Sequence, residues 1–420
     1  MNASRVWDIV RSRWYVALPV AVVVAGVLVP LGYLLVRALQ ADPQTLWDLV
    51  VRWRNLRLLG NTVGLTAGVL VGTTLIAFPL AWLTTRTDLR GRGLLTLLGV
   101  LPLAVPGYVM AYVLLATTGS YGTLAQTLDL VLPRLGGFDG ALIALTLVTY
   151  PYLFLNLRTA LLGVDPAIAE SAQALGYSRW EVFWQVILPQ LRPGFLAGSL
   201  LVGLHVLGDF GVVSLMRFET FSYALYLQYA ASYDRIYAAC LALMLLALTI
   251  AILFLEARLL RGLLLHRTGS GTSRRATPQR LGAWRWAGYA FGGGVALVSV
   301  GLPVVTVGYW MTDIVAGGLP WTSLATSLWA SVSASVPAAV LAALLAVPVA
   351  YLGVRHHSGW TQGIERIAYL GYATPPLAFA LALIVFTLGA VPFAYQTLGL
   401  LVVAYALHFM AEAIGPIRSA

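Results

Sequence analysis

The sequence contains no lysine: all 26 of its Lys and Arg positions are arginine. A phosphate-binding P-loop requires a lysine after its glycines, so the chain is excluded as an ATPase of that kind. Cysteine is almost absent: the chain has one, Cys240, which lies in an apolar run. A disulfide framework within the chain is therefore excluded. If the protein takes part in a process that uses ATP, a second subunit must bind the nucleotide.

Charged residues of either sign are also scarce. They make up 10% of the chain, against about 25% in a typical soluble domain, while hydrophobic residues make up 60% and the mean hydropathy is +0.84. This composition indicates an integral membrane protein that sits in a lipid bilayer. The net charge of +10 comes from arginines scattered over the ends of apolar segments, so we expect no nucleic-acid partner.

Apolar segments long enough to cross a bilayer recur along the whole chain. A membrane-spanning helix needs about 20 mainly apolar residues, and ten segments meet that length. The first follows three arginines and lacks a small-residue cleavage site, which indicates a retained signal anchor. The sequence therefore predicts an all-α polytopic helical bundle with spans at residues 15–38, 59–83, 94–118, 140–160, 195–216, 236–257, 285–311, 324–352, 366–389 and 397–417.

The distribution of arginine sets the expected orientation in the cell membrane. With the N-terminus in the cytoplasm, 19 of the 26 arginines fall on the cytoplasmic side, which agrees with the positive-inside rule. Arg52, Arg54 and Arg57, in the first external loop, go against this bias. The orientation places the moderately polar segment 158–194 in the cytoplasm.

A basic, glycine- and serine-rich stretch at residues 262–284 divides the chain. We expect it to be a cytoplasmic linker between a first half, residues 1–261, and a second half, residues 285–420. The first half holds six of the predicted spans and the second half holds four.

The two halves repeat one another. PLAWLTTR at 79–86 matches PVAYLGVR at 348–355, and the same offset places residues 104–106 on residues 373–375. Internal repeats in a polytopic membrane protein favour a transporter with two related halves around a central path. The chain ends where the first half would enter its polar cytoplasmic segment, so we expect the second half to be truncated.

Segment 158–194 is the one long amphipathic stretch between two strongly apolar segments. Asp165 followed by Pro166 suits a helix start, because the Asp side chain can cap free N–H groups and proline fits the first turn. We expect a short helix over residues 167–175, ended by Gly176 in a left-handed conformation. We interpret the segment as a docking surface for a partner protein; an interfacial hairpin without a partner is the alternative.

A second short helix is expected over residues 180–188. Pro189 and Pro193 should break it before the next span. Its apolar residues fall on one face at helical spacing, and that face can lie at the membrane surface; they are Trp180, Phe183, Trp184 and Ile187.

The residues Glu170-Ser171-Ala172, followed by Gly176 and Pro189, resemble the EAA loop of permease subunits of binding-protein-dependent ABC importers. The match departs from the family at Ser171, where the family usually has alanine. In that family the loop forms a coupling helix in a cleft of the ATP-binding subunit, so Glu170 is expected to pair with a basic residue of that subunit. The resemblance implies a type I-like permease fold and gives ATPase-coupling roles to Asp165, Glu170, Ser171, Ala172, Gly176 and Pro189.

The same resemblance implies the partners. They are an ABC ATPase subunit, expected in two copies and binding ATP and Mg, and a periplasmic or surface solute-binding protein. The chain itself is expected to bind no cofactor and to be a transport subunit rather than an enzyme. Its two fused halves and segment 209–226 look most like ferric-iron permeases of the inner membrane, although thiamine and phosphonate permeases are similar.

His205 and Asp209 lie one turn apart in the fifth predicted span. Ionisable residues inside a span are functional candidates, so the pair is a candidate for the transport pathway or its external gate. The alternative is that the two side chains satisfy each other or the backbone. The other histidines lie in different segments, so three ligands do not converge and no metal site is expected.

Small residues recur every four positions in two of the predicted spans. This spacing gives a helix a smooth ridge, which favours close packing against another helix. The ridges are Gly60, Gly64, Gly68 and Gly72 in the second span, and Ser327, Ser331, Ser335 and Ala339 in the eighth.

An ion-coupled secondary transporter is the contrasting hypothesis. It would account for the spans and the repeat, but it would need several buried acids, and only Asp209 lies clearly mid-span. It also gives segment 158–194 no role. A non-transporting membrane scaffold is a third alternative, and it leaves the repeat unexplained.

Overall fold

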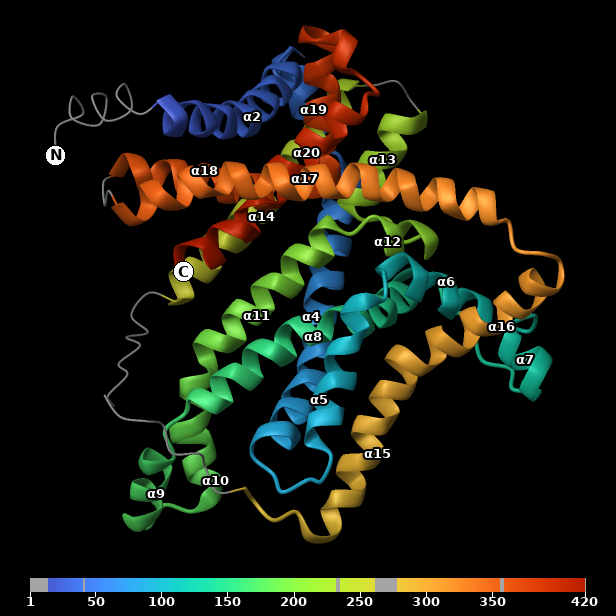
Figure 1. Cartoon of the computed structure of the whole chain (residues 1–420), viewed down its shortest axis with the longest axis vertical. Coiled ribbons are helices and arrows are strands. Elements are labelled where there is room, and N and C mark those ends of the chain that lie inside the picture. Colours follow the sequence, from blue (N-terminus) through green and yellow to red (C-terminus); the bar gives the residue numbers. More distant parts are fainter. Residues whose placement is uncertain (1–13, 41, 232–234, 261–277, 356–358, 420) are drawn as a thin grey trace. The chain divides into compact units, whose positions relative to one another are not determined.

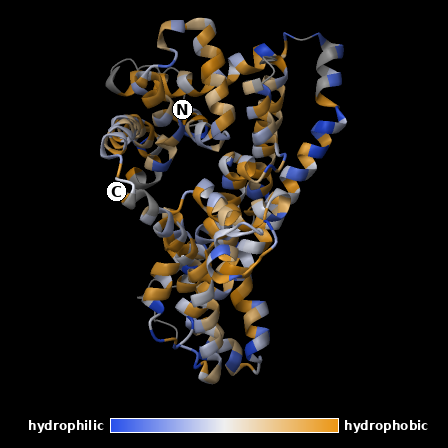
Figure 2. Ribbon diagram, turned by 90° about the vertical axis from the view of Figure 1, so that its right-hand side faces the viewer, coloured by the Kyte–Doolittle hydropathy of each residue, from blue (hydrophilic) through white to orange (hydrophobic). Residues whose placement is uncertain are grey.

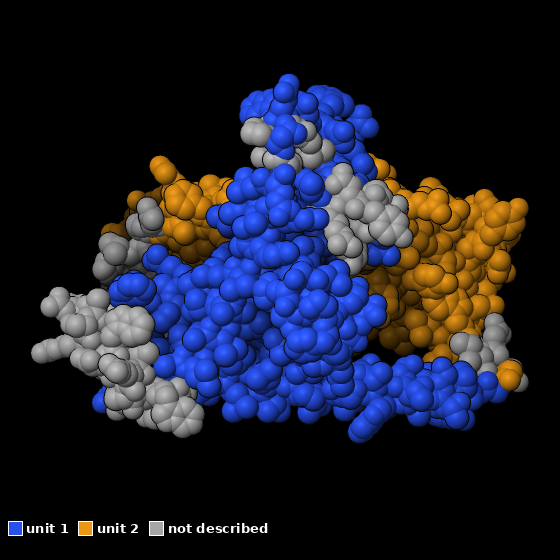
Figure 3. Space-filling view, turned by 90° about the horizontal axis from the view of Figure 1, so that it is seen from above, with its two compact units in different colours: residues 1–57, 224–250, 318–420 blue, residues 58–223, 251–317 orange. Residues whose placement is uncertain are grey.

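The computed structural model describes residues 14–40, 42–231, 235–260, 278–355 and 359–419. The chain forms two compact units, which Figure 3 shows in different colours. Unit 1 comprises residues 1–57, 224–250 and 318–420, and unit 2 comprises residues 58–223 and 251–317. Residues 262–277 of the predicted linker lie outside the described residues, and the division of the chain at that linker stays a prediction.

Every element of the described chain is a helix, and hydrophobic residues run along the helices of both units (Figure 2). Within the described residues, seven helices are long and apolar enough to cross a membrane, or nine if each of two bent pairs counts as one span. A shorter apolar helix at Leu398–Ile414 matches the tenth predicted span. The all-α polytopic architecture is confirmed. The seven helices are Val16–Ala38, Trp53–Thr85, Gly137–Gly163, Arg179–Gly208, Ile236–Leu260, Gly282–Thr312 and Trp321–Arg355.

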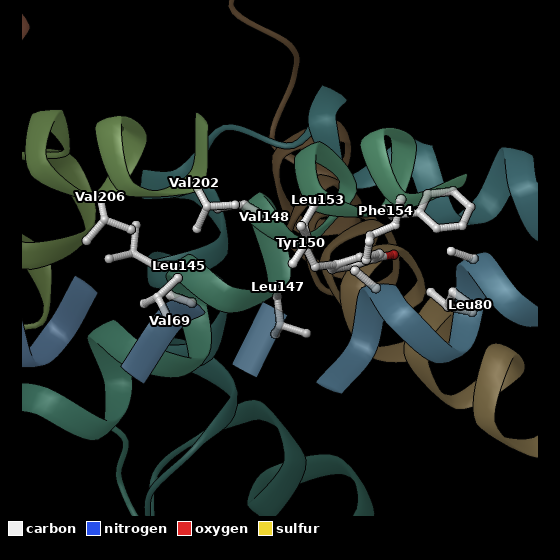
Figure 4. Close-up of a cluster of buried hydrophobic side chains, with 14 of the residues drawn as sticks. Val69, Leu80, Leu145, Leu147, Val148, Tyr150, Leu153, Phe154, Val202 and Val206 are labelled. Carbon is white, nitrogen blue, oxygen red and sulfur yellow. The ribbon is translucent and has the colours of Figure 1, made fainter. Parts of the chain in front are cut away.

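Unit 2 is a helical bundle around α8 (Gly137–Gly163), which is buried along much of its length. Figure 4 shows Leu145 and Phe154 of α8 in one cluster with Val202 and Leu80 from two other helices. The unit also holds most of α4 (Trp53–Thr85) and all of α5 (Arg92–Val100), η1 (Leu101–Ala104), α6 (Gly107–Thr117), α7 (Thr123–Leu128), α9 (Pro166–Ala174), α10 (Arg179–Val182), η2 (Phe183–Ile187), α11 (Leu188–Gly208), α12 (Gly211–Leu215), η3 (Gly282–Trp284), α15 (Arg285–Ala296), η4 (Leu297–Gly301) and α16 (Leu302–Ala316).

Unit 1 has its own apolar core, in which Val23, Ala346 and Met410 are buried. A Cβ atom added at Gly26 would lie 2.6 Å from Leu407 Cδ1, so two helices of this core touch closely. The unit holds α2 (Trp14–Ala38), α3 (Pro43–Val50), α17 (Trp321–Arg355), α18 (Gly359–Ala373), α19 (Pro376–Ala390), η5 (Pro392–Ala394) and α20 (Leu398–Ser419), with most of α13 (Phe221–Ala231) and α14 (Arg235–Leu260).

Helices α8 and α11 of unit 2 pack against each other in antiparallel directions. A Cβ atom added at Gly198 would lie 2.9 Å from Leu153 Cα, and one added at Gly194 would lie 2.7 Å from Ala160 Cβ. Apolar side chains gain little by leaving lipid for protein, so membrane helices associate mainly through such close van der Waals contact. The two glycines therefore let α8 and α11 approach closely enough to hold the segment between them in place.

Two of the predicted spans are bent rather than straight. Helix Arg92–Ala104 meets Gly107–Thr117 at 94°, and Gly359–Ala373 meets Pro376–Ala390 at 103°. Each bent pair coincides with one predicted span, 94–118 or 366–389, and the bend within it was not predicted. A residue before proline is pushed into extended backbone, and Val105 before Pro106 has φ −90° and ψ 112°.

The bends also support the internal repeat. They fall at Val105-Pro106 and at Thr374-Pro375, the positions that the sequence repeat places on one another. In each half a long helix precedes the bend, α4 in the first and α17 in the second. The repeat is therefore present in local structure as well as in sequence.

The predicted glycine ridge of α4 is only partly a contact surface. A Cβ atom at Gly68 would lie 3.0 Å from Leu142 Cδ1 and one at Gly72 would lie 2.8 Å from Thr146 Oγ1, both on α8, whereas Gly60 and Gly64 have no such neighbour within 4 Å. The ridge of the second half lies on an exposed face of α17, so its packing role stays a prediction.

Gly72→Leu should destabilise unit 2, because the new side chain overlaps Thr146 of α8. Overpacking of a close contact costs about 1–3 kcal/mol of unfolding free energy, and the thermal unfolding midpoint of the protein in detergent should fall. The matched control is Gly64→Leu, on the same helix but exposed, which should leave the midpoint unchanged. Equal midpoints for the two variants would contradict the assigned α4–α8 contact.

Candidate functional site

The candidate site is the segment between α8 and α11, and its first helix begins as predicted. The backbone N–H of Ala167 donates to Asp165 Oδ1 at 2.9 Å, and Pro166 occupies the first turn of α9. Asp165 thus satisfies one of the N–H groups that a helix start leaves without a partner. The helix starts one residue earlier than expected, at Pro166.

Gly176 ends α9 in a left-handed conformation, with φ +94°. The N–H of Tyr177 donates to the Ala172 carbonyl at 3.1 Å, and the N–H of Gly176 donates to the Gln173 carbonyl at 3.0 Å. These two bonds form a Schellman motif, the usual way of satisfying the last carbonyls of a helix. The predicted conformation of Gly176 is confirmed, and α9 is capped at both ends.

A second capping device follows directly, and the sequence reading missed it. The N–H of Ser178 donates to Glu181 Oε2 at 2.8 Å, while the N–H of Glu181 donates to Ser178 Oγ at 3.3 Å. The reciprocal bonds form a capping box at the start of α10. A serine followed three residues later by glutamate before an apolar run was the signal that could have found it.

Pro189 and Pro193 do not end the helix that begins at α10, so the predicted break is wrong. The helix runs from α10 through one π turn, η2, into α11, with Pro189 in the first turn of α11 and Pro193 inside it. In the π turn the N–H of Leu188 donates to the Phe183 carbonyl. This wider turn makes room for the proline ring and shifts the hydrogen-bond pattern, so the missing N–H of Pro189 interrupts nothing. Pro189 itself is half-buried.

The three aromatic rings of α10 and η2 pack together, with centroids 5.8 Å apart for Trp180 and Phe183, 5.5 Å for Trp180 and Trp184, and 5.3 Å for Phe183 and Trp184. Trp180 and Trp184 are 68% and 50% exposed, whereas Ile187 is buried and Phe183 is half-buried. The Phe183 ring lies 5.5 Å from the Trp82 ring, in an edge-to-face arrangement. The expected common face therefore holds for the three aromatic residues, whereas Ile187, at the end of the π turn, is buried; contact of this face with the membrane surface stays a prediction.

Helix α9 has two different faces. Pro166, Glu170 and Gln173 line a cavity of about 1060 Å³, and Ala172 is half-buried against the apolar core of unit 2. On the opposite face Ser171 is exposed, and the apolar side chains of Ile168 and Leu175 are 41% and 80% exposed. Of the predicted coupling residues, Glu170 thus faces the cavity and Ser171 faces away from it.

Arg86 connects this cavity to the end of α8. Its side chain is buried, and Nη2 donates to the carbonyl of Leu161 at 2.8 Å. A cation is favourable at a helix C-terminus, where carbonyls lack partners. Burial lowers the pKa of Arg86, but an arginine side chain remains protonated in proteins. The sequence reading gave Arg86 no role, although the repeated motif ends in arginine in both halves.

His205 and Asp209 are not joined to each other by a hydrogen bond. Asp209 Oδ1 accepts from the N–H of Val212 at 2.9 Å and caps α12, while the His205 ring lies 5.7 Å from the ring of Tyr152. Asp209 thus bonds the backbone, as the alternative interpretation expected, and a pathway role for the pair stays a prediction. Among the described residues, no group of three His, Cys, Asp or Glu side chains is arranged to hold a metal ion.

Comparison with known proteins identifies the family. A profile described as "Binding-protein-dependent transport system inner membrane component" matches residues 64–264, which include α9 and α10. Sulfate transport system permease protein CysW of Escherichia coli (strain K12) is 32% identical over 251 residues, 55% of this chain and 82% of CysW. The chain belongs to this permease family.

Two further relatives show how the similarity is distributed along the permease. Fe(3+)-transport system permease protein FbpB 2 of Haemophilus influenzae is 27% identical over 413 residues, 97% of this chain and 79% of FbpB 2. Molybdenum transport system permease protein ModB of the same organism is 34% identical over 157 residues, 36% of this chain and 69% of ModB. The permease is therefore a membrane transport subunit of an ABC importer, and the predicted resemblance is confirmed.

Gly176→Ala should loosen the end of α9, because a Cβ atom in left-handed backbone costs roughly 1–2 kcal/mol. The Schellman bonds of Gly176 and Tyr177 should open more often, and their backbone amides should exchange hydrogen about tenfold faster. Gly163→Ala is the matched control, since Gly163 ends α8 without positive φ and without close neighbours. Identical exchange in both variants would show that Gly176 does not hold this turn.

Proposed function

We propose that this permease carries its cargo across the inner membrane when a separate ABC ATPase moves the segment between α8 and α11. The observation that carries the proposal is α9, a short helix capped at both ends and placed between two spans. The chain has no lysine for a P-loop. In this proposal two copies of the ATPase hold ATP and Mg, and the permease itself binds no cofactor.

The outward face of α9 is the proposed docking surface for the ATPase. Ile168 and Leu175 expose apolar side chains there, beside the small side chain of Ser171. Exposed apolar groups next to small residues suit insertion into a cleft of a partner protein. The pairing of Glu170 with a basic residue of the ATPase stays a prediction, since Glu170 lines the cavity on the other face.

Motion of α9 passes to the spans through its two connections. Upstream, Asp165 follows the end of α8 directly, and downstream the helix is continuous from α10 through η2 into α11. Because α8 and α11 touch at Gly194 and Gly198, they can move only as a pair. We propose that this movement changes unit 2 between states open to opposite sides of the membrane.

The arginines of unit 2 support the proposed orientation, with segment 158–194 and the N-terminus in the cytoplasm. Loop arginines are enriched on the cytoplasmic side of membrane proteins. Figure 1 shows α9 and α10 at the same end of unit 2 as the α4–α5 loop and the start of α15. The segments at this end carry Arg86, Arg90, Arg92, Arg158, Arg179, Arg192, Arg280 and Arg285, and those at the other end carry Arg134 and Arg217.

We propose ferric iron, delivered by a periplasmic solute-binding protein, as the cargo. The support is that the similarity to an Fe(3+)-transport permease extends over 97% of the chain, whereas the ModB match covers 36% of it and the CysW match covers 55%. Molybdate and sulfate are the alternatives that these relatives raise, and thiamine and phosphonate are those that the sequence resemblance raised.

Leu175→Arg should weaken docking of the ATPase without unfolding the permease, because Leu175 is 80% exposed on the outward face of α9. Loss of one central interface contact weakens binding by at least about tenfold, and copurification of the ATPase and transport in vesicles should fall together. Leu128→Arg, at an equally apolar position of α7 that is 69% exposed, is the control. Wild-type transport by Leu175→Arg would overturn the proposed docking face.

The cargo is tested with the purified permease, its ATPase and the cognate solute-binding protein in vesicles. We expect ATP hydrolysis to rise when the binding protein carries Fe(3+) and not when it is offered molybdate, sulfate, thiamine or a phosphonate. Stimulation by one of the other solutes alone would replace iron as the cargo and leave the coupling proposal intact. No stimulation by any of them, together with no ATPase binding, would contradict the coupling proposal as well.

A further inference from the structure

The cavity behind α9 lies where three membrane spans end. Its walls come from the end of α4, from α9 with α10 and η2, and from residues 278–291. The candidate spans Trp53–Thr85, Arg179–Gly208 and Gly282–Thr312 each have one terminus at these walls. These three helices have 33, 30 and 31 residues, more than the ~20 that cross the hydrocarbon, so their ends extend into the headgroup region. The cavity is therefore placed at the membrane surface, on the side that carries α9.

One part of the cavity wall is aromatic. Trp82, Trp180 and Trp284 line it, and Trp180 and Trp284 are 68% and 75% exposed. The other aromatic lining residues are Phe78, Phe183 and Phe291. Tryptophan is enriched at membrane–water interfaces, where the ring meets both acyl chains and polar headgroups. This wall offers an apolar surface for hydrocarbon next to a polar edge.

Three arginines give another part of the wall a positive charge. Arg86, Arg179 and Arg280 line the cavity, and Glu170 is the one acid among the residues that line it. Arg86 donates one N–H to the Leu161 carbonyl. A guanidinium has five N–H donors, so Arg86 has further donors for an anion. Arginine is suited to phosphate because its planar group can donate two parallel hydrogen bonds.

Backbone pairing holds two of these arginines close together. The N–H of Gln279 donates to the Arg86 carbonyl at 2.8 Å, and the N–H of Asp88 donates to the Gln279 carbonyl at 3.1 Å. The N–H of Leu281 donates to Asp88 Oδ1 at 3.0 Å. Arg280, between Gln279 and Leu281, is thus fixed beside the end of α4. The cationic wall is built by the fold rather than by a free surface loop.

We propose that this cavity binds an acidic glycerophospholipid of the surrounding bilayer. Its phosphate bonds the three arginines, and its acyl chains lie along the aromatic wall. A soluble anion would leave the aromatic wall uncovered, and the proposed ATPase surface is on the other face of α9. The bound lipid contacts α9, α4 and the start of α15. The lipid composition of the membrane therefore influences the stability of the contacts that hold segment 158–194 in place.

The test uses the full chain in nanodiscs that contain a photoactivatable phosphatidylglycerol or, separately, a photoactivatable phosphatidylcholine. We expect the acidic probe to label peptides that contain Trp82, Phe183 or Trp284 several-fold more than the neutral probe. In the double variant Arg179→Gln/Arg280→Gln this labelling should fall by about fivefold for each arginine removed, the contribution of one arginine near an anionic surface. Arg90→Gln is the matched control: an exposed arginine of the neighbouring loop that does not line the cavity.

Equal labelling by the two probes in the unaltered chain would overturn the proposal, and this comparison needs no variant to fold. Unchanged labelling in the double variant, or an equal loss in Arg90→Gln, would overturn it too. Displacement of the acidic probe by millimolar inorganic phosphate would assign the cavity to a soluble anion instead. None of these outcomes depends on transport, so they leave the proposed importer function untouched.

Discussion

The close contact between α8 and α11 is the interaction on which the rest of unit 2 depends. Gly194 and Gly198 bring α11 against Ala160 and Leu153 of α8 without intervening side chains. The short helices between these two spans are therefore anchored at both connections. A partner that pushes α9 moves two packed spans, since neither end of the segment is a slack loop. Close packing by small residues is the main association force available to helices inside a bilayer.

Proline organises both halves of the chain, with different effects in different settings. The backbone bends by 94° at Val105-Pro106 and by 103° at Thr374-Pro375. A residue before proline is pushed toward extended backbone, as Val105 shows. At Pro189 the helix continues, because a π turn precedes the ring and accommodates it. A bilayer tolerates interrupted backbone only where neighbouring helices or side chains satisfy it. The recurrence of the bend in both halves shows that it belongs to the repeated unit and is not an accident of one span.

Much of this arrangement was predictable from local sequence rules. Asp165, Pro166 and Gly176 act through their own side chain or backbone, so their positions alone indicated where α9 begins and ends. The spans followed from hydropathy, and the sequence repeat alone aligned the two proline positions at which the bends occur. Ser178 and Glu181 also follow a local rule, so their capping box was predictable from the sequence as well.

The remaining features depend on contacts between distant segments. Arg86 donates to the carbonyl of Leu161, and residues 278–281 pair with the loop after α4. A hydropathy pattern predicts neither contact, because each joins segments far apart in the sequence. The two faces of α9 were not separable either, because the cavity behind Glu170 is built from three parts of the chain. The π turn was missed because it changes the helical period that the sequence reading assumed to be constant.

Coupling in this permease depends on contact between the outward face of α9 and the ATPase. The most direct measurement places a photo-crosslinking phenylalanine derivative at Ser171 or at Gln173, two exposed positions on opposite faces of the same helix. We expect a crosslink to the ATPase from position 171 and little or none from position 173. A crosslink from position 173 with none from position 171 would contradict it.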